Sequence, residues 1–103
     1  MEKSYRITAN GVLTYERTLR LGSANFFIDD YTNAEGERKR GPMALLVMWR
    51  SSGLNLPQQK RVHPGERVTF EDYDITVSAI DGRGRFVEVE IDRHGAGTPR
   101  EVA

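Results

Sequence analysis

Residues 65–80, GERVTFEDYDITVSAI, alternate apolar and polar side chains, and this alternation limits the fold more than any other feature of the chain. Successive side chains of a β-strand point to opposite faces, so a period of two predicts strands with one buried face. With a two-residue turn at 71–72, Phe70 lies opposite Tyr73 and the apolar side chains share one face. The stretch therefore predicts an antiparallel hairpin.

The same alternation continues in FVEVEI at residues 86–91, after the turn sequence DGRGR. Pairing Ala79 with Val87 extends the hairpin into a three-stranded meander and sets Ile80 opposite Phe86 on the other face. The side chains expected to face the core of this meander are those of Val68, Phe70, Tyr73, Ile75, Val77, Val87, Val89 and Ile91.

Strand signals also occur in the first half of the chain. The pair Asn10-Gly11 is a strong hairpin signal, and residues 12–21, VLTYERTLRL, follow it with apolar residues at strand spacing. Residues 43–49, MALLVMW, form a nearly continuous apolar run. A run of this length predicts a central strand that is buried on both faces.

These patterns predict an all-β protein, an antiparallel β-sandwich of about seven to eight short strands. A small closed β-barrel is the alternative, because a strongly twisted meander of this length can close on itself. A chain of 103 residues forms one domain. We expect residues 1–92 to make up this β domain and residues 93–103 to form a C-terminal tail.

Composition narrows the classes of function. Hydrophobic content of 38% with charged content of 29% is typical of a soluble protein, and no apolar run is long enough for a membrane span. We expect a cytoplasmic protein, or a fragment of an exported one. The chain has no cysteine, and its two histidines, His63 and His94, have no third ligand or catalytic partner in their sequence context. We therefore predict no enzyme activity, metal site or cofactor.

Charge is unevenly distributed although the formal net charge is zero. Residues 35–67 hold seven basic and three acidic side chains, a net of +4, and residues 68–103 hold four basic and eight acidic ones, a net of −4. Opposite charges on two parts of one small domain favour contacts with a charged partner or with a second copy.

The most conspicuous candidate binding segment is the basic loop predicted at residues 36–41, which contains Arg38, Lys39 and Arg40. Arginine can bind phosphate with two parallel hydrogen bonds, so this loop could contact nucleic acid. No aromatic residue interrupts the cluster to stack on a base, although Tyr31 lies on the strand that leads into it.

Trp49 and Arg50, at the end of the apolar run, are the other candidate binding residues, because an exposed indole beside a guanidinium can hold a peptide or a sugar ring. Catalytic constellations are absent from the sequence. We therefore predict a non-catalytic β-sandwich module for protein–protein interaction or assembly, with itself or a larger complex as partner. Nucleic-acid binding through the basic loop is the alternative function.

Overall fold

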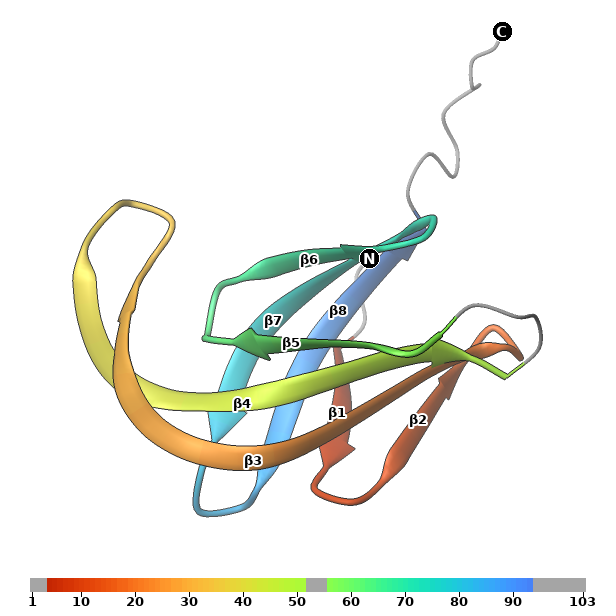
Figure 1. The fold of residues 1–103 in the computed structure, drawn as a ribbon, viewed down its shortest axis with the longest axis horizontal. Coiled ribbons are helices and arrows are strands. Elements are labelled where there is room, and N and C mark those ends of the chain that lie inside the picture. The colour runs from red at the N-terminus through yellow and green to blue at the C-terminus, as the bar shows by residue number, and fades with distance from the viewer. Residues whose placement is uncertain (1–3, 52–55, 94–103) are drawn as a thin grey trace, which may run out of the picture.

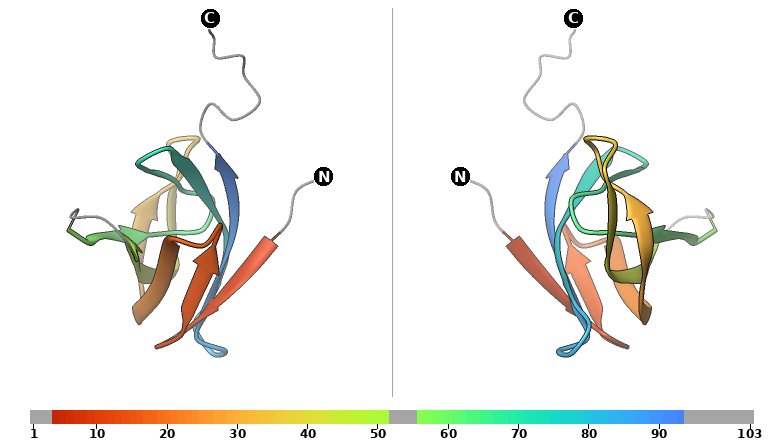
Figure 2. Two further views of the ribbon diagram at one scale, coloured as in Figure 1. Left: turned by 90° about the vertical axis from the view of Figure 1, so that its right-hand side faces the viewer. Right: turned by 90° about the vertical axis from the view of Figure 1, so that its left-hand side faces the viewer.

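A computed structural model describes residues 4–51 and 56–93, and these residues form eight antiparallel strands in two sheets (Figure 1). The strands are β1 (Ser4–Thr8), β2 (Val12–Tyr15), β3 (Leu19–Thr32), β4 (Arg38–Arg50), β5 (Gln58–Val62), β6 (Arg67–Phe70), β7 (Tyr73–Asp81) and β8 (Phe86–Arg93). Sheet A has the order β1-β8-β7-β6, and sheet B has the order β2-β3-β4-β5. Figure 2 shows the two layers from the side. The predicted sandwich is confirmed, and the described strands do not close into the alternative barrel.

Sheet A contains the meander that the alternating pattern predicts. Phe70 pairs with Tyr73 across the two-residue turn, and Val77 pairs with Val89 on the next strand. All eight residues expected on the inner face are buried. Because a shift of one residue would turn every one of them to solvent, the hydrophobic pattern specifies this register strongly.

The predicted register is wrong beyond Val77, because a β-bulge at Ser78 adds one residue to β7. Ala79 therefore pairs with Glu88, and the predicted pair on the outer face does not form. An extra residue reverses the side to which the following side chains point. Ile80 turns into the core, where 7% of its surface is exposed, and Ala79 is left half-buried.

Asn10 and Gly11 form a turn, but the predicted hairpin is wrong. β1 pairs with β8 and β2 pairs with β3, so this turn carries the chain from sheet A to sheet B. Asn10 adopts a φ of 65°, and the Gly11 amide donates to the carbonyl of Thr8 at 2.9 Å. The signal for a tight turn is correct, and the pairing of the flanking strands follows the sandwich instead.

The strand spacing at 12–21 is interrupted by a turn at 16–18, which separates β2 from β3. Glu16 and Arg17 have positive φ angles of 49° and 73° there. Residues other than glycine rarely adopt this conformation, which explains why the sequence gives little signal for a turn at this place.

β4 lies between β3 and β5, as predicted for the apolar run, but the predicted burial of both its faces is wrong. A sandwich of two layers covers only one face of each sheet. The inward side chains, those of Ala44, Leu46 and Met48, are almost completely buried, whereas the outward ones, those of Leu45, Val47 and Trp49, are half-buried.

The distal parts of β3 and β4 leave the sandwich as a curved two-stranded ribbon, which we call the arm (residues 27–43; Figure 1). The register of β3 against β4 shifts between Ala24 and Phe27, where Asn25 has a φ of 53°. A bulge bends the strand that contains it, so this shift lies where the arm begins. β8 ends at Arg93, and the predicted tail beyond it falls outside the described residues.

The described residues include no helix that is long and apolar enough to cross a membrane.

Candidate functional site

The residues predicted to bind a partner lie at opposite ends of the β3–β4 hairpin. Tyr31, Arg38, Lys39 and Arg40 lie on the arm, and Trp49 and Arg50 lie at the far end of β4. The structure therefore does not bring the six predicted residues together into one site.

The basic cluster belongs to strand β4, which begins at Arg38, so its predicted placement in a loop is wrong. Arg38 and Arg40 point to the same side and reach Asp30, with N···O distances of 3.7 and 3.2 Å. Lys39 contacts Glu37 at 3.4 Å. Residues 28–42 contain three basic and four acidic side chains, a net of −1, so the arm offers no excess of positive charge for phosphate groups.

Tyr31 links the arm to the body of the sandwich. Its ring stacks on that of His63, with centroids 4.5 Å apart and planes 10° from parallel. The His63 ring also lies 3.5 Å from the carboxylate of Glu66, in the turn between β5 and β6. The stack connects the arm to the segment that crosses between the two sheets.

Trp49 and Arg50 are neighbours on β4, so their side chains point to opposite faces of sheet B. The Trp49 ring covers Gly22 on the outer face, where an added Cβ would lie 3.6 Å from the indole. Arg50 points inward and has 23% of its side chain exposed. The two residues do not form the joint binding surface that the sequence suggests.

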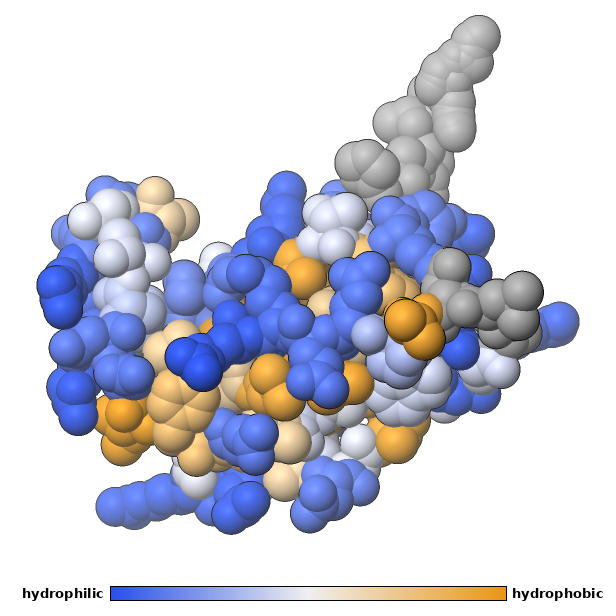
Figure 3. Space-filling view, in the orientation of Figure 1, coloured by the Kyte–Doolittle hydropathy of each residue, from blue (hydrophilic) through white to orange (hydrophobic). Residues whose placement is uncertain are grey.

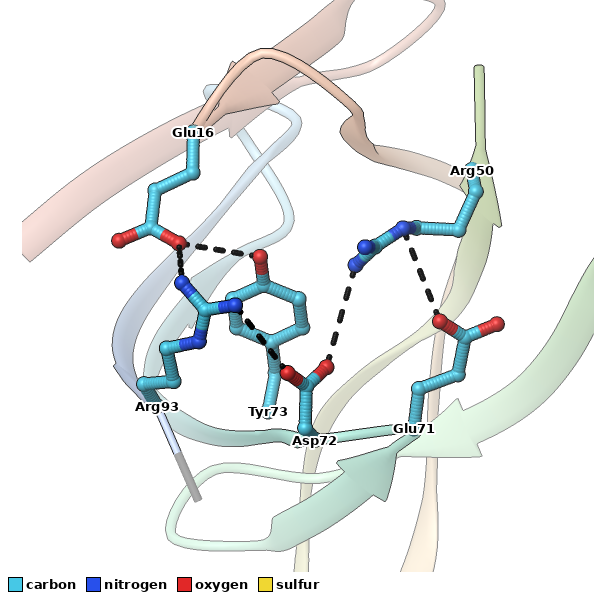
Figure 4. A network of polar contacts seen from close by, with 6 residues as sticks. All are labelled: Glu16, Arg50, Glu71, Asp72, Tyr73 and Arg93. Carbon is cyan, nitrogen blue, oxygen red and sulfur yellow. Dashed lines mark hydrogen bonds and ion pairs between the residues drawn. The ribbon is translucent and has the colours of Figure 1, made fainter. Parts of the chain in front are cut away.

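Arg50 belongs to a polar network at this end of the sandwich, which we call the clasp (Figure 4). Its Nε lies 3.6 Å from Glu71, and its Nη1 lies 3.9 Å from Asp72, too far for a hydrogen bond. Arg93 lies 3.4 Å from Asp72 and donates to Glu16 at 2.9 Å. The clasp thus joins Glu16 and Arg50 of sheet B to residues of sheet A.

Tyr73 lies beneath the clasp and donates its hydroxyl hydrogen to Glu16 at 3.0 Å. Burial raises the pKa of Tyr73 above its ordinary value, and the hydrogen bond to Glu16 raises it further. Burial and the charge of Glu16 also raise the pKa of Tyr15, whose ring meets that of Tyr73 edge to face. With two arginines among three carboxylates, the clasp is a cross-link between the sheets rather than a free anion site.

The opposite end of the sandwich is open and apolar. A groove of about 870 Å³ lies between the base of the arm and the β7–β8 hairpin. Figure 3 shows apolar surface at the base of the arm, beside the hydrophilic distal part. Ile28 is 65% exposed there. The groove is lined by Phe26, Phe27, Ile28, Pro42, Ala79, Ile80, Asp81, Gly82, Arg83, Phe86 and Glu88.

Two local irregularities build the groove. The bulge between Ala24 and Phe27 turns β3 outward, and the bulge at Ser78 leaves Ala79 beside the opening. The β7–β8 turn is held by Asp81, whose Oδ1 accepts hydrogen bonds from the amides of Arg83 and Gly84 at 2.9 and 2.8 Å. The far wall of the groove is therefore a well-defined turn.

A guanidinium group lies over each phenylalanine of the groove. Arg6 lies 4.0 Å from the ring centroid of Phe86, Arg85 lies 5.9 Å from that of Phe26, and Arg61 lies 5.4 Å from that of Phe27. Such stacking holds arginine side chains at the edge of an apolar surface while their donors stay in water.

A partial signal for this groove is visible in the sequence. Phe26, Phe27 and Ile28 are consecutive apolar residues, which a half-buried strand with alternating faces does not require. These three residues and the DGRGR turn are not among the predicted binding residues. The described residues contain no group of three or more potential ligands placed to hold a metal ion.

Comparison with known proteins identifies no relative of this chain. No family model matches the sequence, and neither the curated proteins nor the solved structures include a significant match.

Proposed function

We propose that this protein is a non-catalytic module that binds another protein through the groove at the base of the arm. The observation that carries the proposal is the apolar lining of the groove, where Ile28 is 65% exposed beside three partly exposed phenylalanines at one end of a small domain. Contiguous apolar surface of this kind is typical of interaction sites, whereas scattered exposed apolar residues are not.

The partner is either a second copy of the chain or a component of a larger assembly. The alternative of nucleic-acid binding has less support, because the ion pairs to Asp30 and Glu37 use the basic side chains of the arm. A cytoplasmic location remains part of the proposal.

The test compares two variants that each place a carboxylate on an exposed β-branched residue. Ile28→Asp changes the groove, and Val12→Asp changes β2, where Val12 is 59% exposed and does not line the groove. Sedimentation measures self-association, and cross-linking in extracts of the producing cells identifies other partners. We expect Ile28→Asp to lose the self-association or the cross-linked protein that wild type and Val12→Asp retain.

Two results would overturn the proposal. One is an identical set of contacts in all three proteins. The other is a protein that binds DNA or RNA but no protein partner, and that loses this binding when Arg38, Lys39 and Arg40 are replaced by alanine.

A further inference from the structure

We infer that the groove receives an extended peptide segment that adds as a short strand to the free edge of β3, with apolar side chains in the groove and carboxylates on the surrounding arginines. This inference rests on the protein-binding function proposed above and specifies the kind of partner. Three features of the described residues support it: the position of the groove, the direction of the edge amides, and the charge at the rim.

The groove follows an edge of β3 rather than one of its faces. Phe26, Phe27 and Ile28 all line it in succession, although neighbouring residues of a strand point to opposite faces. β2 pairs with β3 only as far as Gly22, and Ser23 forms an isolated bridge with Ala9. From residue 24 onward, this edge of β3 has no neighbouring strand within the described ranges 4–51 and 56–93.

The amide of Ile28 points toward this free edge. Ile28 pairs with Pro42, and proline has no N–H, so the two residues cannot exchange the paired hydrogen bonds of an antiparallel ladder. Further along, the Asn33 amide donates to the Glu37 carbonyl at 2.9 Å, so the even-numbered residues before it have amides that point away from β4, and the Asp30 amide accordingly donates to the side chain of Asp29 at 2.7 Å. Backbone groups alternate between the two edges of a strand, so both observations place the Ile28 amide outside the hairpin.

The free edge is short. The Asp29 side chain already occupies the amide of Asp30, and charged residues at an edge discourage indefinite strand addition. The stretch around Ile28, next to the bulge between Ala24 and Phe27, remains for pairing. A short pairing of this kind fixes the direction of an incoming segment, and side chains that enter the groove must supply most of the specificity.

The rim of the groove favours acidic groups on the partner. The lining contains Asp81, Glu88 and Arg83, and three more arginines lie over its phenylalanines, which gives two acidic and four basic side chains, a net of +2. Glu88 is paired with Arg6 at 2.9 Å. The exposed guanidinium groups of Arg61, Arg83 and Arg85 form no ion pair within the described residues and remain available for carboxylates.

The first test is selection from a display library of short random peptides on the whole protein. We expect enriched sequences in which apolar residues alternate with other residues and Asp or Glu flank them. Enrichment of basic sequences, of sequences with helical spacing, or of none would overturn the inference.

The second test separates strand addition from simple apolar contact. A selected peptide is compared with the same peptide carrying N-methyl groups on the backbone amides that face the protein. Loss of even one or two backbone hydrogen bonds in a desolvated groove is expected to weaken binding about tenfold or more. Equal affinity of the two peptides, or binding of a fatty acid such as dodecanoate with no binding of the peptide, would overturn strand addition.

Variants of the protein complete the design. Ile28→Pro removes the edge amide, and Ile28→Val keeps it with a similar side chain, so we expect only the proline variant to lose the peptide. Arg83→Glu combined with Arg85→Glu should weaken binding about tenfold, and more strongly at low salt. Amide chemical shifts of residues 24–28 and 79–86 report the site and the integrity of the fold.

The variants Ile28→Asp and Ile28→Pro separate a failure of strand addition from a failure of the proposed function. If Ile28→Asp loses a protein partner but Ile28→Pro keeps it, the groove binds protein by another mode. If Ile28→Asp loses nothing, the proposed function itself is wrong.

Discussion

Leu45 and Leu46 are adjacent and chemically identical, yet their environments differ because one faces solvent and the other faces sheet A. Leu46 is completely buried, and Leu45 is half-buried on the outer face. The same contrast separates Ile80 from Ala79. At the scale of single residues, the face to which a side chain points thus decides its contribution to stability more than its chemical type does.

Truncation of Leu46 to alanine is expected to reduce the free energy of unfolding by about 2–4 kcal/mol, because it removes buried methyl groups and leaves a cavity. Leu45→Ala is the matched control and should cost about half as much or less, since its side chain is already partly exposed to water. Urea unfolding of both variants measures the difference. Equal costs would contradict the assignment of the two faces.

The raised pKa values of Tyr73 and Tyr15 predict a dependence of stability on alkaline pH. Below about pH 10 both phenols are neutral in the folded and unfolded states, so their full contribution is present. Above that pH the unfolded chain loses its phenol protons first, and the free energy of unfolding should fall. Urea unfolding at a series of pH values measures this decline.

Replacing Tyr73 by phenylalanine should make the alkaline decline in stability smaller. It should also lower the free energy of unfolding by about 1–2 kcal/mol at neutral pH, because Glu16 loses a hydrogen bond. Tyr31→Phe is the control, since the Tyr31 hydroxyl forms no hydrogen bond within the described residues. An unchanged alkaline decline in Tyr73→Phe would show that other groups control it.

At the scale of elements, regular strands could be predicted from the sequence and bulged ones could not. The alternation from Val68 to Val77 specifies one register, because every other register exposes apolar side chains. Val77 and Ile80, the buried apolar residues on either side of Ser78, are three positions apart, a spacing that fits a bulge, whereas continued alternation would turn Ala79 inward. The groove depends on two such bulges, so its lining residues could not be assembled from periodicity alone.

A pair of substitutions tests the bulge in β7. We expect Ile80→Asn to cost about 3 kcal/mol or more, because it places an amide in the core and removes apolar contacts. Ala79→Asn should cost less than about 1 kcal/mol, since Ala79 lies beside the open groove. Thermal unfolding of the two variants gives the order of the costs. The reverse order would mean that β7 continues without a bulge.

At the scale of the whole molecule, the two ends of the sandwich differ. The clasp closes one end with ion pairs between the sheets, and the opposite end is left to the arm and the groove (Figures 1 and 4). This division explains why Arg50, a predicted binding residue, has a structural role. Its sequence position beside Trp49 could not reveal that the chain would bring it to Asp72 and Glu71.

The ion pairs of the clasp should couple the two sheets energetically. A double-mutant cycle of Glu16→Gln and Arg93→Gln should give a coupling energy of about 0.5 kcal/mol, a small value because solvent screens both half-exposed groups. The coupling should fall at about 1 M salt. The pair of Glu37 and Lys39 is the control, because both lie on the arm and should show almost no coupling in global unfolding. Equal coupling for both pairs would contradict the cross-linking role.

The antiparallel pairing of β1 with β8 also determines how the molecule responds to force. Ser4, at the start of β1, pairs with Glu90 near the end of β8, so the chain enters β1 and leaves β8 at the same end of sheet A. A pull applied to both ends of the chain therefore loads the hydrogen bonds of this ladder one after another, as in a zipper, and never all together as in shear. The domain should yield to tension at low force, and β1 should be the first strand to peel away.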